Sequence, residues 1–144
     1  KNSFQIMVNC SYNEARDQKK YKTDGKPSAT YNNRVPNRPW VYSNADVSYT
    51  FHNLAQEEDN LRIGYSWQWI HWFYLSWEAY GALESKSRIP TQNVSNLNVT
   101  YSWMKRRYNV SLECSNLFDA TVYDNYKLQK PGRAFFAKFR LLIN

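Results

Sequence analysis

The sequence predicts an all-β protein in which six long antiparallel strands form one arc of a transmembrane β-barrel. Three observations support this fold class. Apolar and polar residues alternate with period two in six separate stretches. The connections between the stretches are alternately long and short, and Tyr and Trp concentrate near the stretch ends. No run of about 18 apolar residues is present, so a membrane would have to be crossed by strands.

The first two expected strands have one apolar and one polar face. In residues 4–13, Phe4, Ile6 and Val8 alternate with polar side chains such as Gln5 and Asn9. In residues 40–51, odd-numbered apolar residues such as Val41, Val47 and Phe51 oppose Asn44, Asp46 and Ser48. Alternation of this kind indicates a strand with one buried or lipid-covered face.

The third expected strand is the longest and covers residues 61–73. Leu61, Ile63 and Tyr65 oppose Arg62 and Ser66, and its later part is aromatic on both faces. By parity, we expect Trp67, Trp69 and Phe73 to face lipid, and Trp72 and Tyr74 to face the lumen near the barrel mouth.

The last three expected strands cover residues 96–103, 108–115 and 135–143. In the first of these strands, the alternate residues Leu97, Val99 and Tyr101 form the apolar face. In the second, Val110 and Leu112 do so. In the last, one parity is apolar (Phe135, Ala137, Phe139, Leu141, Ile143), whereas Lys138 and Arg140 hold the other. Each of the six stretches is longer than the usual globular strand of about five or six residues.

The connections predict the sidedness of the sheet. Residues 16–39, 76–92 and 118–131 form long connections, whereas 52–60 and 104–106 form short ones. If the strands are antiparallel, all long connections lie at one end. Outer-membrane barrels have this asymmetry, with short periplasmic turns and long extracellular loops.

Lipid or a protein core could cover the apolar face, and the sequence leaves both open. Amphipathic rings favour the two membrane interfaces. The rings near the strand ends that fit such girdles are Tyr12, Trp40, Tyr42, Tyr49, Trp69, Trp72, Tyr74, Tyr101, Trp103 and Tyr108. The alternative is a secreted soluble all-β domain that binds glycans through its Trp-rich edge and buries the odd-numbered face of residues 61–73.

The composition excludes several classes of protein. Aromatic residues make up 17 % of the 144 residues, and this high share argues against a disordered chain although the mean hydropathy is −0.77. Cys10 and Cys114 are too few for a disulfide framework or a four-cysteine zinc site. With only His52 and His71 as histidines and no phosphate-binding loop or nucleophile elbow, we expect no enzyme, no metal site and no cofactor.

Two groups of residues in or next to the long connections are candidate ligand-binding residues. Planar rings there could stack on a ligand, and neighbouring polar groups could orient it. The candidates are Trp72, Tyr74, Trp77, Glu78 and Tyr80 in the first group and Tyr123, Asp124, Tyr126 and Lys127 in the second. Packing against a plug or neighbouring loops would explain the same residues.

A basic cluster occupies the first long connection and consists of Arg16, Lys19, Lys20, Lys22, Lys26, Arg34 and Arg38. We expect it to meet lipopolysaccharide phosphates or an anionic ligand, or to be a solvated loop, rather than to bind nucleic acid.

The last third of the chain resembles the C-terminal end of TonB-dependent outer-membrane receptors, in the style found among Bacteroidetes. The resemblance rests on Asn116-Leu117-Phe118-Asp119, which in that family closes the penultimate strand, and on Pro131-Gly132-Arg133, which opens the final one. Residues 34–49 also resemble the family, so the likeness covers roughly residues 34–144. One departure is the chain end Leu142-Ile143-Asn144, where the family usually has an aromatic residue.

The resemblance implies that residues 1–144 form the C-terminal part of a 22-stranded barrel in the outer membrane of a Gram-negative bacterium. The barrel would take up a scarce ligand with energy transmitted by TonB. The expected partners are upstream barrel strands, an N-terminal plug, the TonB complex, outer-membrane lipid with lipopolysaccharide, and a surface lipoprotein. The sequence does not choose among siderophore, haem, cobalamin, glycan or peptide, and a porin-like channel is a further alternative.

Overall fold

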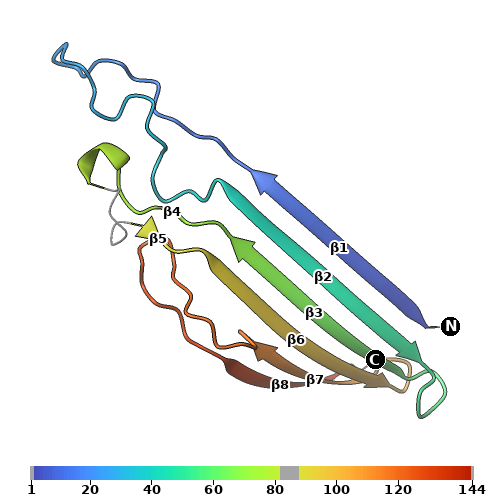
Figure 1. Cartoon of the computed structure of the whole chain (residues 1–144). Helices are drawn as coiled ribbons and strands as arrows, with labels where there is room; N and C mark the ends of the chain where they lie inside the picture. Colours follow the sequence, from blue (N-terminus) through green and yellow to red (C-terminus); the bar gives the residue numbers. More distant parts are fainter. Residues whose placement is uncertain (1, 82–87, 144) are drawn as a thin grey trace.

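The computed structural model describes residues 2–81 and 88–143, and its main element is one six-stranded antiparallel sheet (Figure 1). The strand order is β1-β2-β3-β6-β7-β8, and β4 and β5 pair with each other outside this sheet. The bounds are β1 Ser3–Tyr12, β2 Val41–His52, β3 Asn60–Ile70, β4 Phe73–Tyr74, η1 Glu78–Tyr80, β5 Arg88–Ile89, β6 Gln92–Trp103, β7 Tyr108–Ser115 and β8 Ala134–Leu141. The predicted all-β class and the six long antiparallel strands are therefore confirmed.

The register places the apolar residues of each strand opposite the apolar residues of its neighbour across all six strands. One transverse row of the sheet is apolar and runs Ile6, Val47, Tyr65, Leu97, Cys114, Phe135. Successive side chains of a strand point to opposite faces, so the other parity forms the second face. The parity predicted for each strand therefore combines into one continuous apolar face.

The second face is polar, and hydrogen bonds between neighbouring strands cross it. One of its rows runs Ser3, Thr50, Arg62, Thr100, Ser111, Lys138. Asn44 donates to Asn9 Oδ1 at 3.0 Å and accepts from Gln68 Nε2 at 3.2 Å. The hydroxyls of Thr100 and Ser111 lie 2.9 Å apart. Side-chain ladders of this kind suit a face in contact with water.

The long connections all leave one end of the sheet and the short ones the other (Figure 1). Residues 13–40, the segment between β3 and β6, and residues 116–133 lie at the loop end, although residues 82–87 of the second segment lie outside the described residues. Residues 53–59 and 104–107 lie at the turn end, as do both chain termini. The predicted alternation of connections is confirmed.

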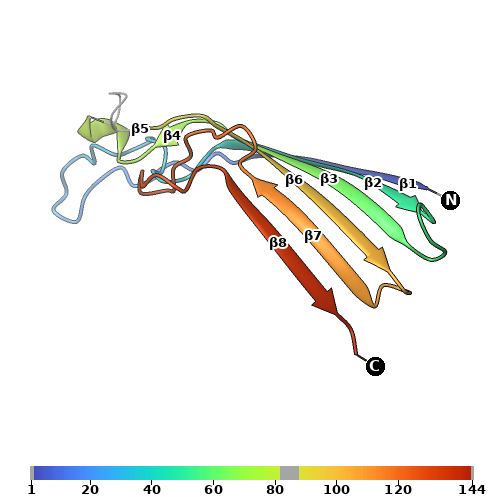
Figure 2. The ribbon, with the colours of Figure 1, turned by 90° about the horizontal axis from the view of Figure 1, so that it is seen from below.

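The sheet is curved and open. Figure 2 shows β7 and β8 turned away from the plane of β1 and β2. Among the described residues, β1 and β8 each pair on one side only, so no closed barrel is formed. An open sheet edge has unpaired N–H and C=O groups that another strand can bind.

Two strand boundaries differ from the prediction by three residues or more. The third strand ends at Ile70 instead of residue 73, because Trp72 N–H turns to Thr91 Oγ1 at 3.3 Å and Phe73 pairs with Ile89. Phe73 is therefore not lipid-facing as parity predicted: it is 1 % exposed within the loops. The fourth strand begins at Gln92, four residues before the predicted start, because its first residues pair with β3.

The buried apolar residues of the described chain lie mostly in the loops. Trp40, Phe73, Tyr74 and Ile89 form one cluster at the loop end, which we call the mouth cluster. The apolar face of the sheet is uncovered, and Ile6 is 63 % and Phe135 75 % exposed. Large apolar patches left exposed indicate an interaction surface.

Asp59 organises the short turn of residues 53–59. Its buried carboxylate accepts backbone N–H groups of Leu54 at 2.7 Å, Ala55 at 2.9 Å and Gln56 at 3.0 Å, and the hydroxyl of Tyr101 at 2.7 Å. The Tyr101 hydrogen bond, with the backbone donors, lowers the pKa of Asp59 to about 2.

We predict that acid weakens this turn. Because the folded-state pKa of Asp59 is below its unfolded value, its contribution to stability is complete above about pH 4 and is lost as the pH falls towards 2. The substitution Asp59→Asn should lower the folding equilibrium constant at neutral pH about tenfold, because the amide cannot accept four hydrogen bonds. Urea titrations followed by tryptophan fluorescence at several pH values measure both effects.

The matched control is Glu57→Gln, which changes an exposed carboxylate in the same turn. It should leave the folding equilibrium nearly unchanged. If the two variants had equal stability and equal acid dependence, Asp59 would not hold the turn.

Candidate functional site

Three long connections meet around the mouth cluster. Asn37 N–H donates to the backbone oxygen of Tyr74 at 2.8 Å, which joins the first connection to β4. Trp40 packs edge-on against Trp72 with ring centroids 4.5 Å apart. Tyr123 from the last connection packs against the same cluster. Contacts among these segments therefore fix the shape of the loop end.

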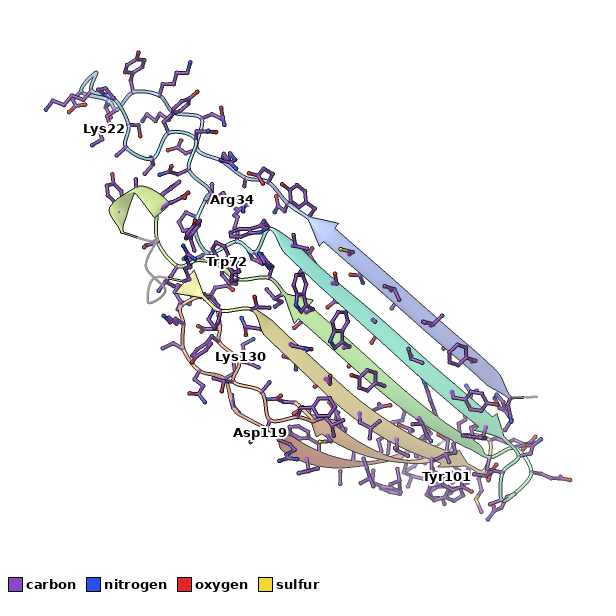
Figure 3. All side chains as sticks on the ribbon, in the orientation of Figure 1. Lys22, Arg34, Trp72, Tyr101, Asp119 and Lys130 are labelled. Atoms are coloured by element: carbon purple, nitrogen blue, oxygen red, sulfur yellow. The ribbon has the colours of Figure 1, made fainter. Side chains whose placement is uncertain are left out.

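Arginine guanidinium groups lie over one ring of the mouth cluster and over Trp72, which packs against the cluster. The guanidinium of Arg34 lies 4.0 Å from the Trp40 ring centroid, and that of Arg88 lies 4.5 Å from the Trp72 ring centroid. Figure 3 labels Arg34 and Trp72 at the loop end of the sheet. Such cation–π contacts stabilise the rings where they approach water.

The first group of predicted ligand residues is largely used in this packing. Tyr74 is 7 % exposed, and its hydroxyl donates to Glu78 Oε1 at 3.2 Å. Burial, with the nearby Glu78 carboxylate, raises the pKa of Tyr74. Trp72 is half-buried against Trp40, and Trp77 is half-buried beside η1. Of the five, Tyr80 is the most open, at 62 % exposed.

The second predicted group forms a tight turn in the last connection. Asp124 Oδ1 accepts the N–H groups of Tyr126 at 2.8 Å and Leu128 at 2.9 Å, and Lys127 occupies a left-handed conformation with φ 63°. The turn leaves Tyr126 75 % exposed. Tyr123 N–H donates to Gln92 Oε1 at 2.8 Å, which joins this turn to β6.

A cavity of about 330 Å³ separates this turn from the polar face of β3 and β6. Phe73 and Pro39 form part of its wall. Its lining combines apolar side chains with amides, a carboxylate and an amine: Pro39, Gln68, Ile70, Phe73, Gln92, Val94, Val122, Tyr123, Asp124, Asn125, Tyr126 and Lys130. Such a lining can hold a partly apolar ligand and orient it by hydrogen bonds.

The structure thus brings together Tyr123, Asp124 and Tyr126 at the cavity, whereas Trp72, Tyr74, Trp77, Glu78, Tyr80 and Lys127 do not line it. Sequence reasoning missed Gln68, Gln92 and Lys130. The alternation in residues 61–73 places Gln68 on the polar face of its strand, so the sequence could have indicated this residue. Gln92 could not be found, because the expected strand began four residues later.

The described residues contain no group of three or more His, Cys, Asp or Glu side chains placed to hold a metal ion. His52 ends β2 at the turn end and His71 follows β3 at the loop end, so these two side chains do not meet.

The two sequence motifs of the last third are brought together at one corner. Asn116 is 5 % exposed, and its side chain donates to Ala120 O at 2.8 Å and accepts from Ala120 N–H at 2.9 Å. The N–H of Leu117 donates to Ser95 O at 2.7 Å, while Phe118 is 73 % exposed. Asn116 thereby closes the turn after β7.

The Pro131-Gly132-Arg133 segment meets this corner through Asp119. Asp119 Oδ1 accepts the N–H of Arg133 at 2.8 Å. A Cβ on Gly132 would lie 2.5 Å from the same oxygen, so a larger residue there would require the Asp119 carboxylate to shift. Pro131 precedes them in the exposed approach to β8. The two motifs therefore act together to set the start of the final strand.

Comparison with family models, with characterised proteins and with solved structures finds no match to this chain. In the described residues, no helix is both long enough and apolar enough to cross a membrane.

We predict that Asn116→Ala destabilises the corner by about 2 kcal/mol. The substitution removes two hydrogen bonds to Ala120 and places alanine at a left-handed position, where φ is 50° and asparagine is better tolerated. Asn116→Gly should recover part of the loss, because glycine relieves the backbone strain but not the missing hydrogen bonds. Urea unfolding of each variant measures the difference.

The control is Asn98→Ala, which removes an exposed side chain of the same type from the polar face. If Asn98→Ala and Asn116→Ala lowered the free energy of unfolding equally, the hydrogen bonds of Asn116 would not stabilise the corner as predicted.

Proposed function

We propose that this chain is the C-terminal arc of a 22-stranded TonB-dependent receptor in the outer membrane of a Gram-negative bacterium. The whole receptor would take up a scarce ligand with energy transmitted by TonB. Within it, residues 1–144 would supply part of the barrel wall and part of the extracellular mouth. The observation that carries the proposal is the continuous apolar face that no part of the described chain covers.

The distribution of rings on that face supports a lipid contact. Its central rows are mainly aliphatic, as in the pairing of Tyr49, Ile63, Val99 and Leu112. Near the turn end, Trp103 stacks between Tyr101 and Tyr108, with centroids 5.5 and 5.4 Å away. The rings of this face near the loop end are Tyr12, Trp67 and Trp69. Two aromatic belts around an apolar band are typical of outer-membrane barrels.

The strand lengths and the open edges agree with a larger wall. β1, β2, β3 and β6 have 10, 12, 11 and 12 residues, which suffices for the roughly 9–11 residues with which a tilted strand crosses a bilayer, and β7 and β8 have 8 each. In this proposal, strands outside residues 1–144 pair with β1 and β8, and a plug occupies the lumen that the polar face lines. Lipid could not satisfy unpaired edges, so closure by such strands is required.

The motif geometry supports the family chosen. Asn116, Asp119 and Gly132 contribute to one corner before the final strand, which is what the resemblance implies for these two motifs. The alternative of a soluble glycan-binding domain needs the odd-numbered face of β3 to be covered. Ile63 is 38 % and Tyr65 36 % exposed on that face, which favours the membrane proposal.

The cavity at the loop end is our proposed ligand contact within this arc. It lies beside the polar face, where a ligand entering the lumen would pass, and Tyr126 at its rim offers an exposed ring for stacking. Siderophore, haem, cobalamin and oligomeric nutrients all remain candidates, because fold does not select among them.

We predict that charge is tolerated on one face of β6 and not on the other. Val99→Arg should place a charge at the centre of the apolar face and destabilise membrane insertion by about 2–4 kcal/mol. Asn98→Arg puts the same side chain on the polar face at the adjacent residue and should insert nearly as the parent chain does. Resistance of the whole receptor to protease in outer-membrane fractions measures the inserted share.

Equal insertion of both variants would contradict the lipid assignment. So would loss of insertion for Asn98→Arg alone, because the lipid-facing parity would then be reversed.

A further inference from the structure

The first long connection, residues 13–40, is an ordered extension that we call the basic lobe. Its two arms are joined by backbone hydrogen bonds, among them Val35 N–H to Ala15 O at 2.9 Å and Ser28 N–H to Lys20 O at 2.8 Å. Figure 3 shows Lys22 at the end of the lobe farthest from the sheet. The side chains of the lobe are therefore held on a defined scaffold.

Glu14, the first of the three carboxylates of the basic lobe, is engaged in local hydrogen bonds and ion pairs. Glu14 accepts the Tyr12 hydroxyl at 2.7 Å, pairs with Arg16 and accepts Arg34 Nη2 at 3.0 Å. These bonds, the Tyr12 hydrogen bond above all, lower the pKa of Glu14 to about 2, so it is charged at neutral pH.

The remaining two carboxylates are also engaged locally. Asp17 accepts Thr30 Oγ1 at 2.6 Å and Lys19 N–H at 2.9 Å, which lower its pKa. Asp24 accepts Lys26 N–H at 3.1 Å, and the Lys26 amine lies 3.7 Å away.

The lysines, by contrast, face outward. The lobe has seven cationic residues and three carboxylates. Lys19, Lys20 and Lys22 are exposed, and within the described part of the chain no carboxylate lies within ion-pair distance of their amines. Lys20 lies over the Tyr31 ring at 5.6 Å. The carboxylates are thus engaged in local hydrogen bonds and ion pairs, whereas Lys19, Lys20 and Lys22 are exposed without a carboxylate at ion-pair distance among the described residues.

We propose that the basic lobe binds clustered phosphate groups, carried either by a lipid headgroup or by a soluble polyanion. Several ammonium groups on one scaffold can contact neighbouring phosphates together, and each lysine near such a surface adds about a fivefold gain in affinity. The cations are exposed, so the interaction is screened by salt. This inference does not depend on the transporter proposal, because the lobe would bind phosphate clusters whatever the sheet contacts.

The test compares two variants of the full chain in a zwitterionic detergent. Lys19→Gln with Lys22→Gln removes two outward charges from the lobe, whereas Lys105→Gln with Arg106→Gln removes two exposed charges from the turn end. The probes are bisphosphorylated lipid A, its dephosphorylated form and inorganic polyphosphate. We expect the lobe variant to weaken binding of a phosphorylated probe roughly 25-fold and the turn variant to change it less than threefold.

The arms of the test identify the source of the phosphates. Binding of lipid A alone, lost on its dephosphorylation, assigns the lobe to lipid headgroups. Binding of polyphosphate with equal sensitivity to Lys19 and Lys22 assigns it to soluble polyanions. The proposal is overturned if neither phosphorylated probe binds at low salt, if binding persists undiminished at high salt, or if both double variants lose affinity equally.

Discussion

The cross-strand register is the constraint on which the rest of the structure depends. Because the register sets the apolar residues of each strand opposite those of its neighbour from β1 to β8, apolar side chains that are scattered in sequence form one surface, and polar side chains form the other. A shift of one residue in any pair would move that strand's apolar residues to the polar face. The polar bonds between Asn44 and Gln68 and between Thr100 and Ser111 exist only in this register.

The same antiparallel order sorts the connections. The short turns at one end are stabilised by local hydrogen bonds, as with Asp59, whereas the long connections at the other end support each other through Trp40, Phe73 and Tyr74. Apart from Cys114 in β7, the buried apolar residues of the described chain therefore lie at the loop end and not on the six-stranded sheet. This division leaves one apolar and one polar face of the sheet and a loop end held together by packing, which is the combination that the proposed barrel transporter requires.

The strands were predictable because each carries its own alternation, as with Leu61, Ile63 and Tyr65. The end of β3 was not, because parity assumes that the strand continues, and aromatic residues on both faces gave no sign of the break after Ile70. The candidate site was predictable only in part. Tyr123, Asp124 and Tyr126 stand out in one loop, but Gln92 and Lys130 reach the cavity through contacts between segments far apart in sequence. The alternation within each strand indicated one apolar face per strand. Only the cross-strand register shows that these apolar faces join into one uncovered surface.

The most direct test of the central claim is the accessibility of adjacent β6 residues in a bilayer. Nitroxide labels at positions 98 and 99, in a variant with Cys10 and Cys114 replaced by alanine, would be compared for collision with oxygen, which concentrates in lipid, and with a water-soluble nickel complex. Our account predicts that the label at position 99 is reached mainly by oxygen and the label at position 98 mainly by nickel. Equal accessibility at both positions, or the reverse order, would contradict the assignment of the apolar face to lipid.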